Sequence, residues 1–110
     1  MGFLDGLFGN KKGGSVIGVD VGSSSLKVVQ LRREGGTAVL ETYGEIALGP
    51  YASAEVGQAT NLPADKIAET LKDLLREANV TTKNAGLSIP FSRSLLTLVS
   101  LPRRANAEEQ

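Results

Sequence analysis

Apolar and polar positions alternate in three stretches that follow residue 15 of this 110-residue chain. A β-branched run at residues 16–21 ends at Gly22, which is typical of a mostly buried strand. A second apolar run occupies residues 26–31, and a third alternates over residues 37–48. Residues 32–36 contain two glycines and predict the turn between the last two runs. Three strands joined by tight turns indicate an antiparallel meander.

The spacing becomes helical after a polar stretch at residues 49–61, which we interpret as a loop. Asn61 and Pro63 mark the beginning of the helix, with Pro63 expected at its first helical position. Asn79 is a candidate left-handed cap at its end. The charged residues along the helix are typical of an ordinary solvated face. One apolar face is made by Ile67, Leu71, Leu74, Leu75 and Ala78.

Alternation returns after the helix. Residues 85–89 predict a fourth strand that stops at Pro90, and residues 95–101 predict a fifth that ends at Pro102. The expected fold class is therefore α/β: a three-strand meander followed by a helix and one or two further strands.

We divide the chain into a leader at residues 1–14, a folded part at 15–102 and a linker at 103–110. The leader's apolar residues fall at helical spacing ahead of two lysines. This pattern fits an amphipathic turn against a membrane surface or partner, but the three glycines at positions 2, 6 and 9 disfavour a helix, so we favour a loose, glycine-rich end that packs on the domain. The linker carries no apolar side chain larger than alanine, so we expect it to open an inserted subdomain that is missing here.

Composition narrows the possible chemistry. Twelve basic and twelve acidic residues give a formal net charge of zero, so the chain lacks the basic character of a nucleic-acid-binding domain. It has no cysteine and no histidine, which excludes thiolate and imidazole metal ligands and nucleophiles. Any metal ion must therefore be a hard cation held by oxygen ligands.

The most informative motif follows the first strand. Asp20 lies at the end of that strand, and the sequence continues through Gly22 to Ser23, Ser24 and Ser25. Glycine allows the backbone to bend, and the following amides and hydroxyls suit phosphate oxygens. Asp20 is placed to hold Mg²⁺ directly or through water, and Lys27 offers a positive charge. The same residues also suit a plain strand–turn–strand hairpin, and the motif alone does not separate the two interpretations.

Residues 17–27 resemble the first phosphate motif of the actin, Hsp70 and sugar-kinase superfamily. The motif consists of an apolar strand, Asp-x-Gly-Ser/Thr-x-Ser/Thr and then a basic residue. The order of meander and helix is similar to the first subdomain of that ribonuclease-H-like fold. More closely, the whole chain resembles the beginning of the PilM family of type IV pilus assembly proteins, which are related to FtsA. The leader, the triple serine, residues 40–45, Ser88-Ile89-Pro90 and Leu101-Pro102 carry that resemblance.

The resemblance implies a cytoplasmic, actin-like platform that binds ATP and Mg²⁺ at the periphery of the inner membrane. Its expected partners are the cytoplasmic tail of a PilN-like inner-membrane protein and other components of the pilus motor. By position, Asp20 matches the Mg²⁺-associated carboxylate, and Gly22, Ser23, Ser24 and Ser25 match the phosphate loop. Lys27 is a looser match.

Three features of the superfamily's nucleotide site are missing from this sequence. The second phosphate loop, the adenosine-binding glycine pair and the acidic residue for turnover belong to later segments of such proteins. We therefore expect an N-terminal fragment with half a nucleotide site, which by itself is inactive and binds ATP poorly because little of the ligand is enclosed. The exposed edges of an incomplete sheet also favour oligomerisation.

Two other functions stay open from the sequence. One is a phosphotransfer ATPase of the sugar-kinase or Hsp70 type, which uses the same first loop. The other is a membrane-surface module without nucleotide, in which Asp20 has no role. The sequence leaves open whether the full-length protein is a weak ATPase, because the residues needed for turnover are not in it.

Overall fold

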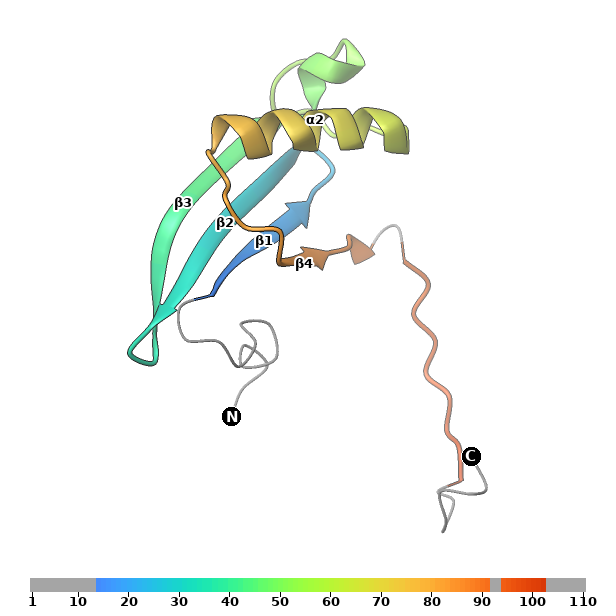
Figure 1. Cartoon of the computed structure of the whole chain (residues 1–110). Coiled ribbons are helices and arrows are strands. Elements are labelled where there is room, and N and C mark those ends of the chain that lie inside the picture. Colours follow the sequence, from blue (N-terminus) through green and yellow to red (C-terminus); the bar gives the residue numbers. More distant parts are fainter. Residues whose placement is uncertain (1–13, 92–93, 103–110) are drawn as a thin grey trace.

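The computed structural model describes residues 14–91 and 94–102. The described elements run in chain order as β1 (Ser15–Val21), β2 (Ser25–Glu34), β3 (Thr37–Ala47), the 3-10 helix η1 (Gly49–Ala52), α2 (Ala64–Glu77) and β4 (Ala85–Ser88). The strands form one sheet in the order β3-β2-β1-β4. Helix α2 packs against β2 and β3 on one face of this sheet (Figure 1).

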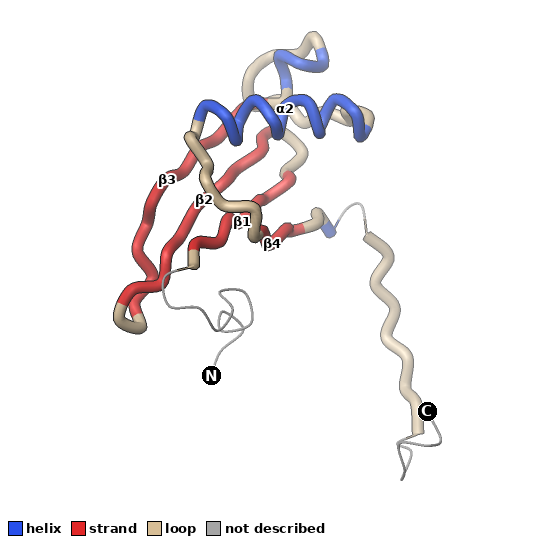
Figure 2. Tube along the Cα trace, in the orientation of Figure 1, coloured by secondary structure: helices blue, strands red, loops and turns tan. Residues whose placement is uncertain are grey.

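The strand directions confirm the predicted meander and the α/β fold class. Strand β2 pairs antiparallel with both β1 and β3. Strand β4 pairs in parallel with the other side of β1. Helix α2 lies in the connection that carries the chain from β3 across to β4. An antiparallel meander, a helix and a parallel fourth strand beside the first form a partial ribonuclease-H-like or actin-like subdomain. Figure 2 shows the single layer of strands with the helix across it.

The core lies between the sheet and α2. Leu26 is fully buried at 0% exposure, and Leu74 reaches the same cluster from the helix. The predicted apolar helix face is confirmed, since Leu74 and Ala78 are buried and Ile67, Leu71 and Leu75 pack against them. Thr70 is also fully buried, and its hydroxyl donates to the Lys66 carbonyl at 2.8 Å. That back-bond within the helix satisfies the hydroxyl, so a polar residue fits the apolar face.

Two boundaries differ from the sequence prediction. The turn between β2 and β3 is confined to Gly35 and Gly36, whose φ angles of 56° and 83° suit a tight hairpin. The helix begins one residue later than expected, because Pro63 has an extended backbone with ψ of 158° and serves as the N-cap. Asn79 adopts the predicted left-handed conformation at φ 53°.

The segments on either side of α2 also differ from expectation. The predicted loop at residues 49–61 contains η1, a short 3-10 helix with proline in its first turn. Strand β4 ends at Ser88, so Ile89 lies outside it. The predicted fifth strand is wrong: the described residues 94–102 are extended but pair with no strand (Figure 2). A strand needs a neighbour to accept and donate its backbone hydrogen bonds, and this segment runs away from the sheet.

The proposed leader and linker lie almost entirely outside the described residues. Only Gly14 of the leader is described. The division of the chain at residues 15 and 102 therefore stays a prediction.

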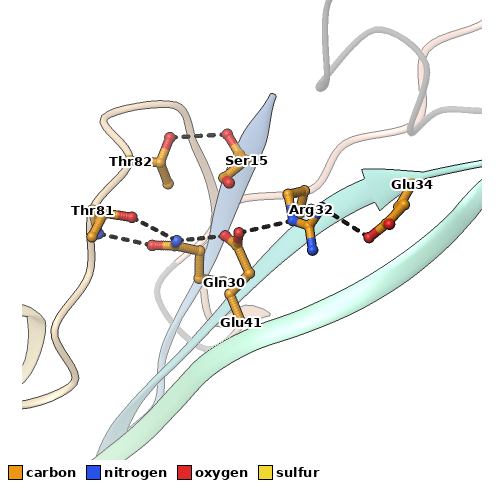
Figure 3. A network of polar contacts seen from close by, with 7 residues as sticks. All are labelled: Ser15, Gln30, Arg32, Glu34, Glu41, Thr81 and Thr82. Carbon is orange, nitrogen blue, oxygen red and sulfur yellow. Dashed lines mark hydrogen bonds and ion pairs between the residues drawn. The ribbon is translucent and has the colours of Figure 1, made fainter. Parts of the chain in front are cut away.

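A polar network fixes the loop that leads from α2 into β4 (Figure 3). Gln30 on β2 is 2% exposed, and its side-chain nitrogen donates to Glu41 at 2.6 Å and to the Thr81 hydroxyl at 2.9 Å. Its side-chain oxygen accepts from the Thr81 backbone N–H at 2.9 Å. Next to it, the Thr82 hydroxyl donates to the Ser15 carbonyl at 2.9 Å. Because a buried amide is costly unless its groups are paired, this network ties the loop to the sheet at a defined position.

The carboxylate in this network is held in its charged form. Hydrogen bonds from Ser15 and Gln30, together with the positive charge of Arg32, keep the pKa of Glu41 below its ordinary value near 4.5. The Arg32 Nε lies 3.2 Å from Glu41 Oε1. Glu41 thus favours the folded state only while it is ionised.

Substitution of Leu26 tests the position of the core. Leu26→Ala should lower the free energy of unfolding by about 2–5 kcal/mol, because it removes a fully buried side chain and leaves a cavity. Leu40→Ala is the matched control, since Leu40 is 54% exposed on β3, and it should cost less than about 1 kcal/mol. Urea unfolding followed by circular dichroism measures both. Equal losses would contradict the assigned core.

The Glu41 network predicts a pH dependence of stability. The pKa of Glu41 is depressed in the folded state, so its stabilising contribution is present above pH 4.5 and is lost as the pH falls through the folded value. Stability of the native chain and of Glu41→Gln should therefore differ at neutral pH and converge in acid. Urea midpoints at a series of pH values measure this, and a difference that stays constant into acid would contradict it.

Candidate functional site

The candidate site lies on the sheet face opposite α2. Successive residues of a strand point to opposite faces, and Val19 belongs to the core cluster under the helix, so Asp20 points to the other face. In register, Asp20 lies opposite Lys27 on β2 and beside Ser88 on β4. Lys27 lies opposite Glu45 on β3. These four residues, which we call the polar row, cross the whole sheet at one level.

Ser88, like Glu45, belongs to the polar row although neither was predicted from the sequence as a candidate site residue; the parallel strand β4 places Ser88 there. Its hydroxyl donates to Oδ1 of Asp20. The two residues are 68 positions apart, and only the parallel pairing of β4 with β1 brings them together. The contact fixes one carboxylate oxygen of Asp20 and leaves the second for another partner.

Lys27 lies next to Asp20 and faces the same side of the sheet. Its Nζ is 3.9 Å from Oε1 of Glu45, at the outer limit of an ion pair. Both side chains are more than half exposed, at 57% and 60%. Water screens such a pair strongly, so Lys27 is held only weakly and can turn toward a bound anion.

The loop of Gly22, Ser23 and Ser24, with Ser25 at the start of β2, joins β1 to β2 directly beyond the polar row, and we call it the serine loop. Its carbonyl oxygens are tied to two other segments: the Leu48 N–H donates to Ser24 at 2.8 Å, and the Thr60 N–H donates to Ser23 at 2.8 Å. The Ser24 N–H shares a trans peptide plane with the Ser23 carbonyl, so it points away from Thr60. The loop is therefore anchored through its carbonyls, which leaves the Ser24 amide directed away from that anchor.

Gly22 is required by the shape of this turn. Its N–H donates to the Ser25 carbonyl at 3.0 Å, and a Cβ built on Gly22 would lie 2.8 Å from the same oxygen. A larger residue would have to displace the backbone there. The structure thus assigns Gly22 a steric reason that the sequence only indicated through a turn preference.

A groove of about 490 Å³ adjoins the polar row. Gly18, Val29 and Gly86 line it one level further along the strands, while Asp20, Lys27 and Ser88 line it at the polar row. Gly18 and Gly86 lie side by side on neighbouring strands, and because neither has a side chain, the backbone itself forms the floor of the groove there. An apolar surface that ends in a few polar groups is the usual composition of a small-molecule site.

The residues present suit a hydrated Mg²⁺ ion in part. Mg²⁺ is usually held by one or two carboxylates, waters and the ligand's own phosphates. Asp20 offers one carboxylate with an open oxygen. The described part of the chain contains no group of three or more acidic, cysteine or histidine side chains that could hold a metal ion by itself. A cation here would therefore depend on oxygens from a bound phosphate.

No protein-family model matches the chain. Among solved structures, it is similar to a Ppx/GppA enzyme of Aquifex aeolicus, with 20% identity and a TM-score of 0.41. A second structure, described as the Aquifex aeolicus member of the Ppx/GppA family, gives 22% identity and a TM-score of 0.39. Each match covers 66% of this chain, which spans about a quarter of the matched proteins, 25% and 24%.

Because the TM-scores are below 0.5, the fold assignment rests on the strand order and register of this chain. Both proteins are described as Ppx/GppA proteins, so neither bears on the resemblance to pilus assembly proteins.

Within residues 14–91 and 94–102, no helix is long and apolar enough to cross a membrane.

The weak hold on Lys27 can be measured by a double-mutant cycle. Lys27→Met, Glu45→Gln and the double variant should give a coupling energy of about 1 kcal/mol or less, because both charges are exposed. The coupling should shrink further in high salt. Urea unfolding of the four proteins gives the value, and a coupling well above 1 kcal/mol would show that Glu45 holds Lys27 away from any ligand.

Proposed function

We propose that this chain carries the first phosphate-binding half of an actin-like nucleotide site, in a PilM-type platform protein of type IV pilus assembly. The ligand is ATP with Mg²⁺, and the platform lies in the cytoplasm at the inner membrane. Its expected partners are a PilN-like cytoplasmic tail and other motor components. The second half of the site comes from segments beyond those described.

One observation supports the nucleotide part above the others. Asp20, Lys27 and the serine loop lie together at one end of the central strand β1, with Ser88 fixing the Asp20 carboxylate. A plain hairpin turn requires Gly22, and a cross-strand charge pair would account for a lysine opposite Asp20, but the ion pair that Lys27 makes is with Glu45. This arrangement has the polarity of a Mg²⁺-phosphate site, with a carboxylate for the cation and an amine and amides for the anion.

Each residue has a separate role in this proposal. Asp20 holds a water of the Mg²⁺ ion through its open oxygen. Ser24 and Ser25 offer an amide and hydroxyls to phosphate oxygens. Lys27 leaves Glu45 and places its charge on the phosphates. When bound, Mg²⁺ neutralises part of the phosphate charge and orients the nucleotide's tail.

Poor affinity is part of the same proposal. The described residues contact the phosphate end of a nucleotide and leave the base and ribose in water, so little ligand surface is buried. A dissociation constant of about 1 mM or weaker is expected for the chain alone, which corresponds to about 4 kcal/mol of binding free energy.

Titration of the ¹⁵N-labelled chain with millimolar Mg-ATP tests this by NMR. The amides of residues 22–25 should shift, and removal of Mg²⁺ with a chelator should reduce the change. Asp20→Asn should lose the Mg²⁺-dependent part. Asp73→Asn, a matched exchange on α2 where Asp73 pairs with Arg76, should keep it. Submicromolar binding, or shifts confined to another part of the chain, would refute the half-site.

Two further probes separate the other functions. A synthetic peptide of a PilN-like cytoplasmic tail should bind if the pilus platform is correct, and its failure with intact Mg-ATP shifts would favour a phosphotransfer ATPase. Vesicles of anionic lipid test the membrane-surface function. If the vesicles recruit the chain while Mg-ATP leaves residues 22–25 unchanged, both nucleotide-binding functions are refuted.

A further inference from the structure

The segment from Leu95 to Leu101 exposes an unusual amount of apolar surface. Leu98 is 100% exposed and Leu95 is 94% exposed. The seven residues contain five large apolar side chains and no charge. Soluble proteins rarely expose a contiguous apolar segment of this kind unless another surface covers it. Its extended backbone also leaves N–H and C=O groups available for pairing.

A turn directs this segment away from the sheet of its own chain. The Ser94 N–H donates to the Phe91 carbonyl at 3.0 Å. The Ser94 hydroxyl donates to the Pro90 carbonyl, also at 3.0 Å. Figure 1 shows the segment running away from β4 beyond this turn. Pairing with β4 of the same chain would require the turn to open.

The free edge of β4 offers a matching acceptor. Strand β4 is last in the sheet and pairs with β1 alone. It contains no charged residue, and Leu87 within it is 61% exposed. The groove over Gly18 and Gly86 lies beside this strand and provides an apolar surface for side chains of an added strand.

The opposite edge of the sheet is a poorer acceptor. Strand β3 carries Glu41 and Glu45, and a register irregularity interrupts its pairing with β2. A carboxylate on an edge discourages an uncharged apolar strand from pairing there. The β4 edge and the segment 95–101 are both uncharged, so they fit each other better.

We propose that residues 95–101 of one copy add as a strand to the free β4 edge of a second copy. Each copy has one such segment and one such edge, so two copies can exchange their segments reciprocally, and we take this closed, symmetric dimer as the assembly to be tested. Backbone hydrogen bonds supply the pairing, and leucines of the added strand cover the groove and Leu87 of the partner. This inference does not rest on the proposed function, but the groove is the one that adjoins the polar row, so an added strand and a bound nucleotide would compete for it.

Analytical ultracentrifugation over a range of concentrations tests the assembly. The native chain should sediment as two copies of 11.5 kDa that dissociate on dilution. Leu98→Asp should weaken the dimer by about tenfold or more, because pairing would bury a carboxylate. It should fold normally, since Leu98 is fully exposed in the single chain. Val56→Asp is the matched control at 77% exposure in a distant loop and should leave the dimer intact.

A spin label identifies the edge. Since the chain has no cysteine, Ser100→Cys gives a single attachment point. Mixed with ¹⁵N-labelled unmodified chain, it should broaden the β4 amides of the labelled copy. Broadening at β3 instead, a monomer at all concentrations, a monomer with residues 95–101 protected from hydrogen exchange, or assembly without defined stoichiometry would each overturn the proposal.

Discussion

The parallel pairing of β4 with β1 is the constraint on which the other features depend. A parallel neighbour cannot be reached through a tight turn, so the chain must leave the sheet and return from the opposite end. Helix α2 provides that crossing, and its apolar face supplies the core against β2 and β3. The buried amide of Gln30 then receives the returning chain at Thr81. Together with the Ile17 N–H, which donates to the Asn84 carbonyl at 2.9 Å, this contact places the start of β4 beside β1.

The register of β4 in turn creates the site. When Ala85 pairs with Ile17, Ser88 falls beside Asp20 and Gly86 beside Gly18. A shift by one residue would move Ser88 to the helix side and replace it with an apolar neighbour. The polar row and the groove are therefore products of one alignment. The network in Figure 3 lies at the far end of β1 from Asp20 and holds the loop that leads into β4.

The open face gives the fold its incomplete character. Helix α2 covers one side of the sheet, while the polar row and the groove lie on the other. All-parallel sheets are normally covered on both faces, whereas antiparallel sheets can leave one face in water, and this mixed sheet has two antiparallel pairs and one parallel pair. Apolar surface is also left exposed beyond the edge of the sheet. The leucines of residues 95–101 are exposed, and the uncharged strand β4 has no neighbour on its outer side among the described residues. The proposed nucleotide half-site and the proposed strand exchange both rest on surfaces that the described residues leave uncovered.

Sequence reasoning succeeded where a local pattern decides the structure. The meander, the apolar face of α2 and the left-handed Asn79 each depend on residues near one another in the chain. It failed at Leu95–Leu101, where strand-forming residues have no neighbour to pair with. The buried Thr70 was also missed, because threonine is polar, although it lies three residues after Ile67 and four before Leu74 on the same face and satisfies its hydroxyl within the helix.

The candidate site divides in the same way. Asp20, Gly22, the serines and Lys27 were proposed from the sequence, since a strand, a glycine, a run of hydroxyl residues and a lysine follow one another directly. Their surroundings could not be found. Ser88 meets Asp20 across 68 positions, and Lys27 turns out to share its face with both Asp20 and Glu45. The sequence by itself determined the three strands of the meander, the helix and the glycine-serine loop at residues 22–25, because short-range sterics and periodicity control them. Tertiary structure decided which residues surround the loop, because strand register is a long-range property of the whole sheet.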